Sequence, residues 1–275
     1  IMTTPLKEKI QNLKSELESI PKGSFEPRIQ LLFSGNSVFG SQGIKTNFVA
    51  KAVTPFQEMV KTQAALARFG RVGKRGKAKT GISSDLYITA LPRGSFGVEL
   101  SQLETEDLFD SLDVSNAIKE VVNIINSSAT DDVTFERIIS NVPKRNLSNL
   151  KKLLETISSN NSILKMESNE IGVQISESKV KEAYFRVAQT IDSEKELIVK
   201  GIFRGILLDS GRFEIQDEEG KKISGFISPD LSEDELISYD QDFLNKNCTI
   251  SLKEHQTIFK TGNVKIEYEL LEIKD

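Results

Sequence analysis

The spacing of apolar residues changes once along the chain, near residue 193. Before that point most apolar positions recur every three or four residues, which predicts amphipathic helices with short alternating segments between them. After it, apolar and polar residues alternate through a series of short segments, which predicts half-buried strands. The charged sequence SEKE at 193–196 is the best boundary between the two patterns. We therefore expect a mixed α+β domain over residues 2–192 and a small β-barrel domain over residues 193–275.

The first part is predicted to contain both strands and helices. A buried strand at 28–34 precedes a long helical stretch at 44–69. Within that stretch Thr54 and Pro55, followed by Gln57, predict that a new or kinked helix begins. The further elements, in order, are a hairpin over 85–103, helices over 114–126, 131–141 and 146–159, a short hairpin over 163–176 and a helix over 179–191. The helices near 114–160 therefore form a helical segment within an α+β domain.

The second part is predicted to be an all-β unit with one short helix. The predicted strands cover 196–208, 212–217, 221–228, 247–255 and 263–273, and the helix lies within 231–244. Five strands with a helix between the third and the fourth match the element order of an OB-type barrel. An SH3-like barrel is the alternative, because the number and alternation of strands do not fix how the barrel closes.

Composition narrows the class of protein. The chain has 275 residues, 38% of them hydrophobic, and a formal net charge of −4. It has no apolar run that approaches the ~20 residues of a membrane-spanning helix. Its first residues are polar and lack the apolar core of a signal peptide. These features predict a cytoplasmic protein without a membrane partner.

The scarcity of cysteine and histidine excludes several kinds of catalytic site. Cys248 is the only cysteine, so the chain can form neither an intrachain disulfide nor a cluster of thiolate ligands. His255 is the only histidine, which excludes a multi-histidine metal site. A single histidine on a strand is far more often structural or solvated than a general base. We therefore assign no catalytic residue, no metal and no cofactor.

A strongly basic segment stands out in this acidic chain. Six cationic residues fall within 68–79: Arg68, Arg71, Lys74, Arg75, Lys77 and Lys79. The glycines between them predict an exposed loop. This loop could dock on an acidic protein surface, contact nucleic-acid phosphates, or only be solvated. It could also be neutralised, within the chain or across an oligomer interface, by nearby acidic residues: Glu99, Glu104, Glu106, Asp107, Asp110 and Asp113.

A second feature suggests nucleic-acid binding. The two helices over 131–141 and 146–159, followed by a hairpin, have the order of a winged helix. In that arrangement four residues would face phosphates: Lys144, Arg145, Lys151 and Lys152. The same leucine spacing also suits any small helical bundle. The barrel argues against phosphate binding, because residues 193–275 hold 18 acidic and 11 basic residues, a balance of −7. Four of its aromatic residues are candidates for base stacking, Phe203, Phe213, Phe226 and Tyr268, but they suit a core better than a stacking surface.

Two glycine-bearing loops could form an anion site. One is the predicted hairpin turn with Arg93, Gly94 and Ser95, which offers a guanidinium and free backbone amides. The other follows the first strand and holds Ser34, Gly35 and Gly40; it has the glycine spacing of a phosphate loop but lacks the lysine. These residues could hold an anion or nucleotide only if the two loops converge. Turns that need positive backbone angles explain the glycines without a ligand.

The N-terminal segment is predicted to be an amphipathic helix with one apolar seam. The seam consists of Leu6, Ile10, Leu13, Leu17 and Ile20. It is too short for an independent coiled coil, so it packs on its own domain or on a partner helix.

Taken together, these features predict a non-enzymatic binding or assembly protein that self-associates or docks a protein partner. The alternative is a DNA- or RNA-binding protein that uses the loop 68–79 and the segment 131–175. A third reading is an enzyme or sensor with an anion pocket between the glycine loops.

Overall fold

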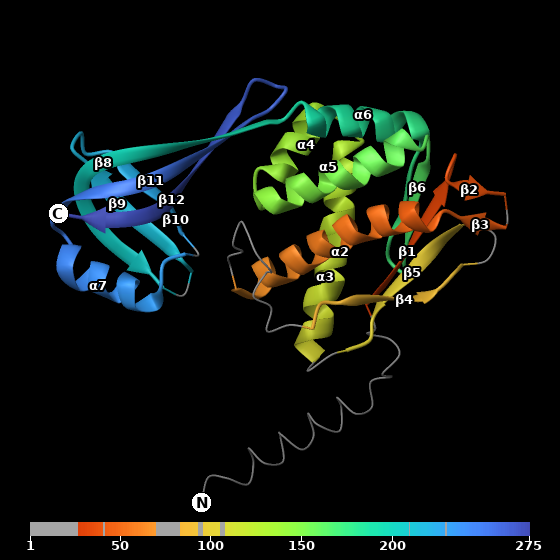
Figure 1. The fold of residues 1–275 in the computed structure, drawn as a ribbon, viewed down its shortest axis with the longest axis horizontal. Helices are drawn as coiled ribbons and strands as arrows, with labels where there is room; N and C mark the ends of the chain where they lie inside the picture. Colours follow the sequence, from red (N-terminus) through yellow and green to blue (C-terminus); the bar gives the residue numbers. More distant parts are fainter. Residues whose placement is uncertain are drawn as a thin grey trace, which may run out of the picture.

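The computed structural model describes residues 27–40, 42–69, 83–92, 96–104, 108–208, 210–228 and 230–275. Its first unit is built on a five-stranded antiparallel sheet of order β4-β5-β1-β6-β7 (Figure 1). The strands are β1 (Arg28–Ser34), β4 (Leu86–Ala90), β5 (Phe96–Gln102), β6 (Ile163–Glu167) and β7 (Gly172–Ile175). The small ladder β2 (Val38–Phe39) and β3 (Gly43–Ile44) lies apart from this sheet.

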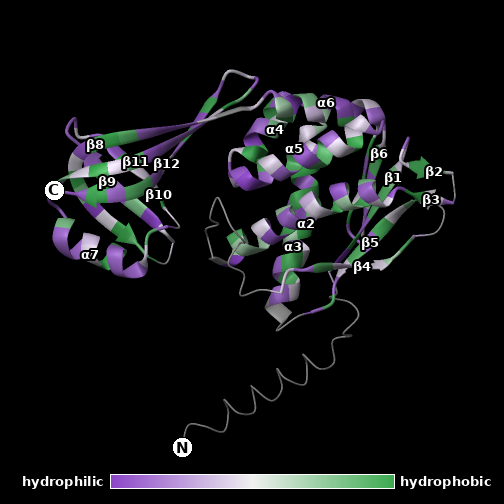
Figure 2. Ribbon diagram, in the orientation of Figure 1, coloured by the Kyte–Doolittle hydropathy of each residue, from purple (hydrophilic) through white to green (hydrophobic). Residues whose placement is uncertain are grey.

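Five helices pack on one side of this sheet (Figure 1). They are α2 (Thr46–Phe69), α3 (Leu108–Ser128), α4 (Asp132–Ile139), α5 (Lys144–Ser159) and α6 (Glu177–Ala188). Hydrophobic and hydrophilic residues alternate around these helices (Figure 2), because each buries one face. On β1, Ile29, Leu31 and Phe33 alternate toward the same core.

The second unit is a closed barrel of five strands. The strands are β8 (Ile191–Leu207), β9 (Arg212–Asp217), β10 (Lys222–Ile227), β11 (Asn247–Ile258) and β12 (Val264–Lys274), and α7 (Glu233–Phe243) lies between the third and the fourth. They are hydrogen-bonded in the circuit β10-β12-β11-β8-β9. A parallel pair, β10 with β12, closes the barrel. In chain order this circuit is 1-2-3-5-4, the OB order, so the structure confirms an α+β chain with a C-terminal five-stranded barrel.

Some sequence-based boundaries differ from the structure. Pro55 lies inside α2, which runs unbroken from Thr46 to Phe69, so of the two alternatives at this position, a new or a kinked helix, the new helix is excluded. Buried residues on both sides of the proline, Ala52 and Phe56, hold the helix together through packing. The last helix of the first unit ends at Ala188, and Ile191 is the first residue of β8 instead of the end of that helix.

The β11–β12 hairpin is much longer than the barrel needs. Its far end, residues 255–267, which we call the hairpin arm, reaches the helices of the first unit (Figure 1). The β11–β12 pairing has a register shift between Ser251 and Leu252, and the alternation of burial along β11 changes just beyond it, at Lys253 and Glu254. Up to Leu252, Cys248, Ile250 and Leu252 are buried; from His255 on, His255 and Thr257 are buried instead. The arm thus turns a different set of side chains inward.

One buried residue of the first unit predicts a stabilising substitution. Asn146, in the first turn of α5, is fully buried, and neither polar atom of its side chain has a hydrogen-bond partner in the part of the chain that the structure describes. A buried amide without partners costs about 1–3 kcal/mol. Asn146→Leu should therefore raise the free energy of unfolding by about 1–2 kcal/mol in urea denaturation. Ser148→Leu, at an exposed position of the same helix, is the matched control. Equal effects of the two substitutions would contradict this account.

Candidate functional site

The only described cationic residue of the basic segment 68–79 is bound within its own chain. Arg68 lies in the last turn of α2, and its guanidinium lies 2.7 Å from Asp110 and 3.1 Å from Asp113 on α3. These carboxylates belong to the acidic stretch that could neutralise the segment. The other cationic residues, Arg71, Lys74, Arg75, Lys77 and Lys79, lie outside the described residues, as do the N-terminal seam (Leu6, Ile10, Leu13, Leu17 and Ile20) and the turn residues Arg93, Gly94 and Ser95.

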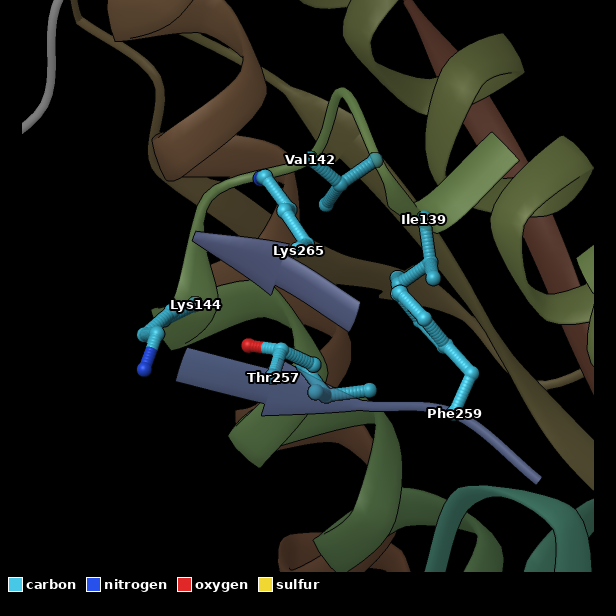
Figure 3. Close-up of a pocket in the computed structure, with 7 residues that line it drawn as sticks. Ile139, Val142, Lys144, Thr257, Phe259 and Lys265 are labelled. Carbon is cyan, nitrogen blue, oxygen red and sulfur yellow. The ribbon is translucent and has the colours of Figure 1, made fainter. Parts of the chain in front are cut away.

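The four cations of the winged-helix hypothesis all lie on α5, but in different surroundings. Lys151 and Lys152 are exposed in the middle of the helix, whereas Lys144 and Arg145 are half-buried at its start. Lys144 lines a crevice of about 10 Å³ together with Thr257 and Lys265 of the hairpin arm (Figure 3). The start of a recognition helix is the part that contacts base edges. Here that end lies against the hairpin arm.

The glycine loop after β1 packs against the turn between α5 and β6. Asn36 donates its backbone N–H to Asn160 O over 2.9 Å, and the Ser37 hydroxyl donates to Asn160 Oδ1 over 2.5 Å. Gly35 has φ +122°, and a Cβ there would lie 2.7 Å from the Ser162 hydroxyl. The glycine is therefore needed for a close approach of two protein segments. Ser34 is exposed, and Gly40 lies in a turn with φ +52° and open space around it.

Elsewhere on the first unit, a depression of about 330 Å³ lies between the end of α3, strand β7 and the start of α6. Its one charged lining residue, Lys179, is bound to Glu182 at 2.7 Å. Within the described ranges, no group of three or more His, Cys, Asp or Glu residues is arranged to hold a metal ion. No helix among the described residues is long and apolar enough to cross a membrane.

The tip of the hairpin arm is held on α4 by an apolar contact and by charged groups. Phe259 joins the core of the first unit, and its side chain extends toward Ile139 and Val142 (Figure 3). Glu136 of α4 accepts hydrogen bonds from the Thr261 hydroxyl and, over 2.7 Å, from Asn263 Nδ2. The barrel is thereby fixed to the helices.

Asp132, the first residue of α4, joins the tip of the arm to α6. It binds the Arg186 guanidinium of α6 and lies 3.4 Å from Lys260 Nζ of the arm. The hydrogen bond from Arg186 lowers the pKa of Asp132 below its usual value, and Lys260 acts in the same direction. A carboxylate whose pKa is lowered in the folded state stabilises the fold above its unfolded pKa, about 3.9, and this contribution is lost as the pH falls through the folded pKa.

The effect of Asp132 should therefore depend on pH. Asp132→Asn should destabilise the protein at neutral pH, and the difference from wild type should shrink as the pH falls below about 4. Urea-unfolding midpoints measured from neutral to acidic pH test this. Glu155→Gln, at an exposed position of α5, should show no comparable change. A difference between Asp132→Asn and wild type that stays constant down to the lowest pH would contradict it.

In the barrel, the only histidine belongs to a buried polar group. His255 is buried in the hairpin arm, its Nε2 lies 2.8 Å from Glu269 Oε2, and Phe226 stacks on its ring at 5.9 Å between centroids. Its Nδ1 lies 3.2 Å from Glu194 Oε1 without the alignment of a hydrogen bond. Of the aromatic residues considered for stacking, Phe203 and Phe213 are buried in the barrel core, and Phe226 and Tyr268 are half-buried.

A candidate interaction surface that sequence reasoning missed is the free edge of β4. This strand pairs with β5 and, among the described residues, with no strand on its other side. Ile88 is 56% exposed, and Leu91, just beyond the strand, is 72% exposed. No charged residue occurs between Asp85 and Arg93. Natural edge strands are commonly protected by charges, so an uncharged apolar edge is suited to pairing with another strand.

Charged residues lie near both ends of β4, because Glu99 of β5 is opposite Ala90 and Asp85 comes just before the strand. Asp85, just before β4, is bound to Lys61 of α2 at 2.5 Å. The Tyr87 hydroxyl donates a hydrogen bond to Glu104 over 2.7 Å, and this contact raises the pKa of Tyr87. The hydroxyl groups of Thr89 and Ser101 form a hydrogen bond of 3.0 Å. The strand itself is thus uncharged, and Asp85 at its beginning is neutralised by Lys61.

Comparisons with known proteins add no further assignment. The chain matches no family model, and neither the curated proteins nor the solved structures that were searched contain a match.

Proposed function

We propose that this protein is a non-enzymatic assembly protein that docks a protein partner by adding a strand to β4. The observation that carries the proposal is the open edge of the first sheet, which is uncharged and bears an exposed isoleucine at its centre, Ile88. A strand added there would pair with backbone groups of β4 beyond Leu86, whose N–H donates to Gln57 Oε1 over 2.9 Å, and its side chains would cover those of β4. This is how many proteins bind extended segments of their partners.

The cationic residues give less support to a nucleic-acid interface. Arg68 is engaged by two carboxylates of its own chain, and Lys144 lies at the contact between α5 and the hairpin arm. Each phosphate contact needs a cation that can approach the nucleic-acid backbone. Arg68 and Lys144 would have to leave their present contacts to reach a phosphate, whereas the edge of β4 is already exposed.

A display experiment tests the proposal without knowledge of the partner. A random peptide library should be selected on the intact protein and on the variants Ile88→Lys and Phe185→Lys. Phe185 lies on α6 and is 61% exposed, so its substitution adds the same charge at a similarly exposed position away from β4. We expect extended peptides with alternating apolar residues, bound by the intact protein and by Phe185→Lys but not by Ile88→Lys. Selected peptides that bind all three proteins equally, or an empty selection, would overturn the proposal.

Nucleic-acid binding is the second candidate, favoured by one observation. The helices α4 and α5 are followed by the β6–β7 hairpin, as in a winged helix, and Lys151 and Lys152 are exposed on α5. Fluorescence anisotropy with short DNA and RNA at low and moderate salt tests it. Binding that weakens steeply with salt and is lost in Lys151→Glu/Lys152→Glu would support this candidate. Absence of binding at low salt would exclude it.

A further inference from the structure

We infer that His255 is a pH-sensitive clamp: when its Nδ1 gains a proton, the imidazolium ties the hairpin arm to β8 through the side chain of Glu194. This inference goes beyond the proposed function, because it concerns how firmly the barrel is joined to the first unit. The hairpin arm makes that connection, since Phe259 at its tip lies in the core of the first unit. Strand β8 pairs with β11 along the arm (Figure 1), so a clamp between the two strands stiffens the connection.

The two ring nitrogens of His255 have different surroundings. Nε2 lies 2.8 Å from Glu269 Oε2 on β12, and an ionised carboxylate can only accept a hydrogen bond, so the proton of the neutral ring is on Nε2. Nδ1 then carries a lone pair. This atom is buried, has no hydrogen-bond partner among the described residues, and lies 3.2 Å from Glu194 Oε1 on β8. In the neutral state two acceptors therefore face each other.

A proton on Nδ1 turns this contact from repulsive to attractive. Both nitrogens of an imidazolium are donors, so Nδ1 can donate to Glu194 while Nε2 keeps its hydrogen bond to Glu269. The side chain of Glu194 is 45% exposed and has room to align with the N–H. Hydrogen bonds between ionised groups are about twice as strong as those between neutral ones. One protonated side chain thus joins three strands, β8, β11 and β12.

The charged groups around the imidazole ring are mainly carboxylates. Glu194 of β8 and Glu267 of β12 lie directly opposite His255 on its two neighbouring strands. Lys265 of β12 binds Glu267 at 3.2 Å, and Phe226 of β10 stacks on the ring. Further charged residues lie at neighbouring positions of the strands and at the start of α5: Lys195, Glu196, Lys253, Glu254, Arg212 opposite Phe226, and Lys144. The added positive charge therefore meets carboxylates on both adjacent strands.

The clamp should hold at acidic pH and release as the pH rises through the titration of His255, because the contact with Glu194 exists only in the protonated state. Hydrogen exchange of the intact chain at about pH 5.5 and about pH 8 spans the range in which histidine changes its charge. Protection factors, which correct for the direct effect of pH on exchange, should be about tenfold higher at the acidic pH for residues 193–197 and 253–257. Glu194→Gln should remove this difference. Glu196→Gln, at an exposed position two residues along β8, should keep it.

Nitrogen NMR of the wild-type chain gives a second readout that does not depend on the folding of a variant, and its imidazole signals are unambiguous because His255 is the only histidine. At high pH the ring proton should be on Nε2, and Nδ1 should gain a proton on acidification. A proton on Nδ1 at high pH, or a ring that does not titrate between about pH 5 and 8, would overturn the inference. So would protection that does not change with pH, or a change that survives Glu194→Gln or is lost equally in Glu196→Gln.

Discussion

Replacing Phe259 with Ala should lower the free energy of unfolding by about 3–5 kcal/mol, the usual cost of removing a buried phenylalanine side chain. Phe259 belongs to the hairpin arm of the barrel, but its side chain is buried in the core of the first unit and is only 6% exposed. The truncation removes an aromatic ring that lines the same crevice as Ile139 and Val142, and it leaves a cavity at the contact. Urea denaturation followed by circular dichroism measures the loss.

The control for this prediction is an exposed phenylalanine of the first unit, Phe39. Phe39 is 74% exposed, so Phe39→Ala should change stability by no more than about 0.5 kcal/mol. Hydrogen exchange adds a second readout, because undocking of the hairpin arm should expose the amides of α4 while those of the barrel core stay protected. Equal, small effects of the two substitutions would show that the arm does not anchor the barrel to the helices.

Local patterns were sufficient to predict most elements of the fold. The hairpin over 85–103 became β4 and β5, because alternating residues on either side of a turn leave few other arrangements. The leucine spacing of α5 and the alternation in the barrel strands were equally local signals. The choice between OB and SH3 order was not local. It depends on which strands pair, β10 with β12 in this case, and pairing over such a distance leaves no periodic signal in the sequence.

The contact between the two units could not be predicted for the same reason. The alternation in β11 was followed only to His255, but the strand continues to Ile258, and Phe259 then lies beside Ile139 and Val142, more than a hundred positions earlier in the chain. Pro55 in α2 is a second example, in which packing overrides a local helix-start signal.

The candidate site shows most clearly what the sequence alone could not predict. The sequence identifies β4 as a strand, but its position at the edge of the sheet depends on β1 pairing with β5 and β6 instead. The charged residues are conspicuous in the sequence, but they gave less information about the candidate interaction surface than the strand pairing did. Arg68 shows why: a cation in a basic segment is paired by the carboxylates that the fold brings to it.

His255→Leu should also destabilise the protein by about 1–3 kcal/mol, because it removes a buried hydrogen-bond partner of Glu269. The substitution leaves the buried carboxylate of Glu269 without its hydrogen bond to Nε2, which is 2.8 Å long in the wild-type protein. The stacking of Phe226 on the imidazole ring is lost as well. Urea denaturation measures the loss, and Cys248→Ala serves as a control for simple truncation in the barrel core. Its expected cost is about 1 kcal/mol, near the average for single substitutions.

The double variant His255→Leu/Glu269→Leu separates the cost of losing one partner from the value of the pair. If the loss in His255→Leu comes from the lost hydrogen bond to the buried Glu269 side chain, removing that side chain as well should restore most of the stability, since replacing both partners of a buried hydrogen bond by apolar groups of the same shape can be nearly neutral. The coupling energy from the double-mutant cycle should then be large and of opposite sign to the single losses. Additive losses would instead show that His255 and Glu269 stabilise the arm independently, through packing and through contacts with other groups. The cycle thus decides whether the pair acts as one buried unit.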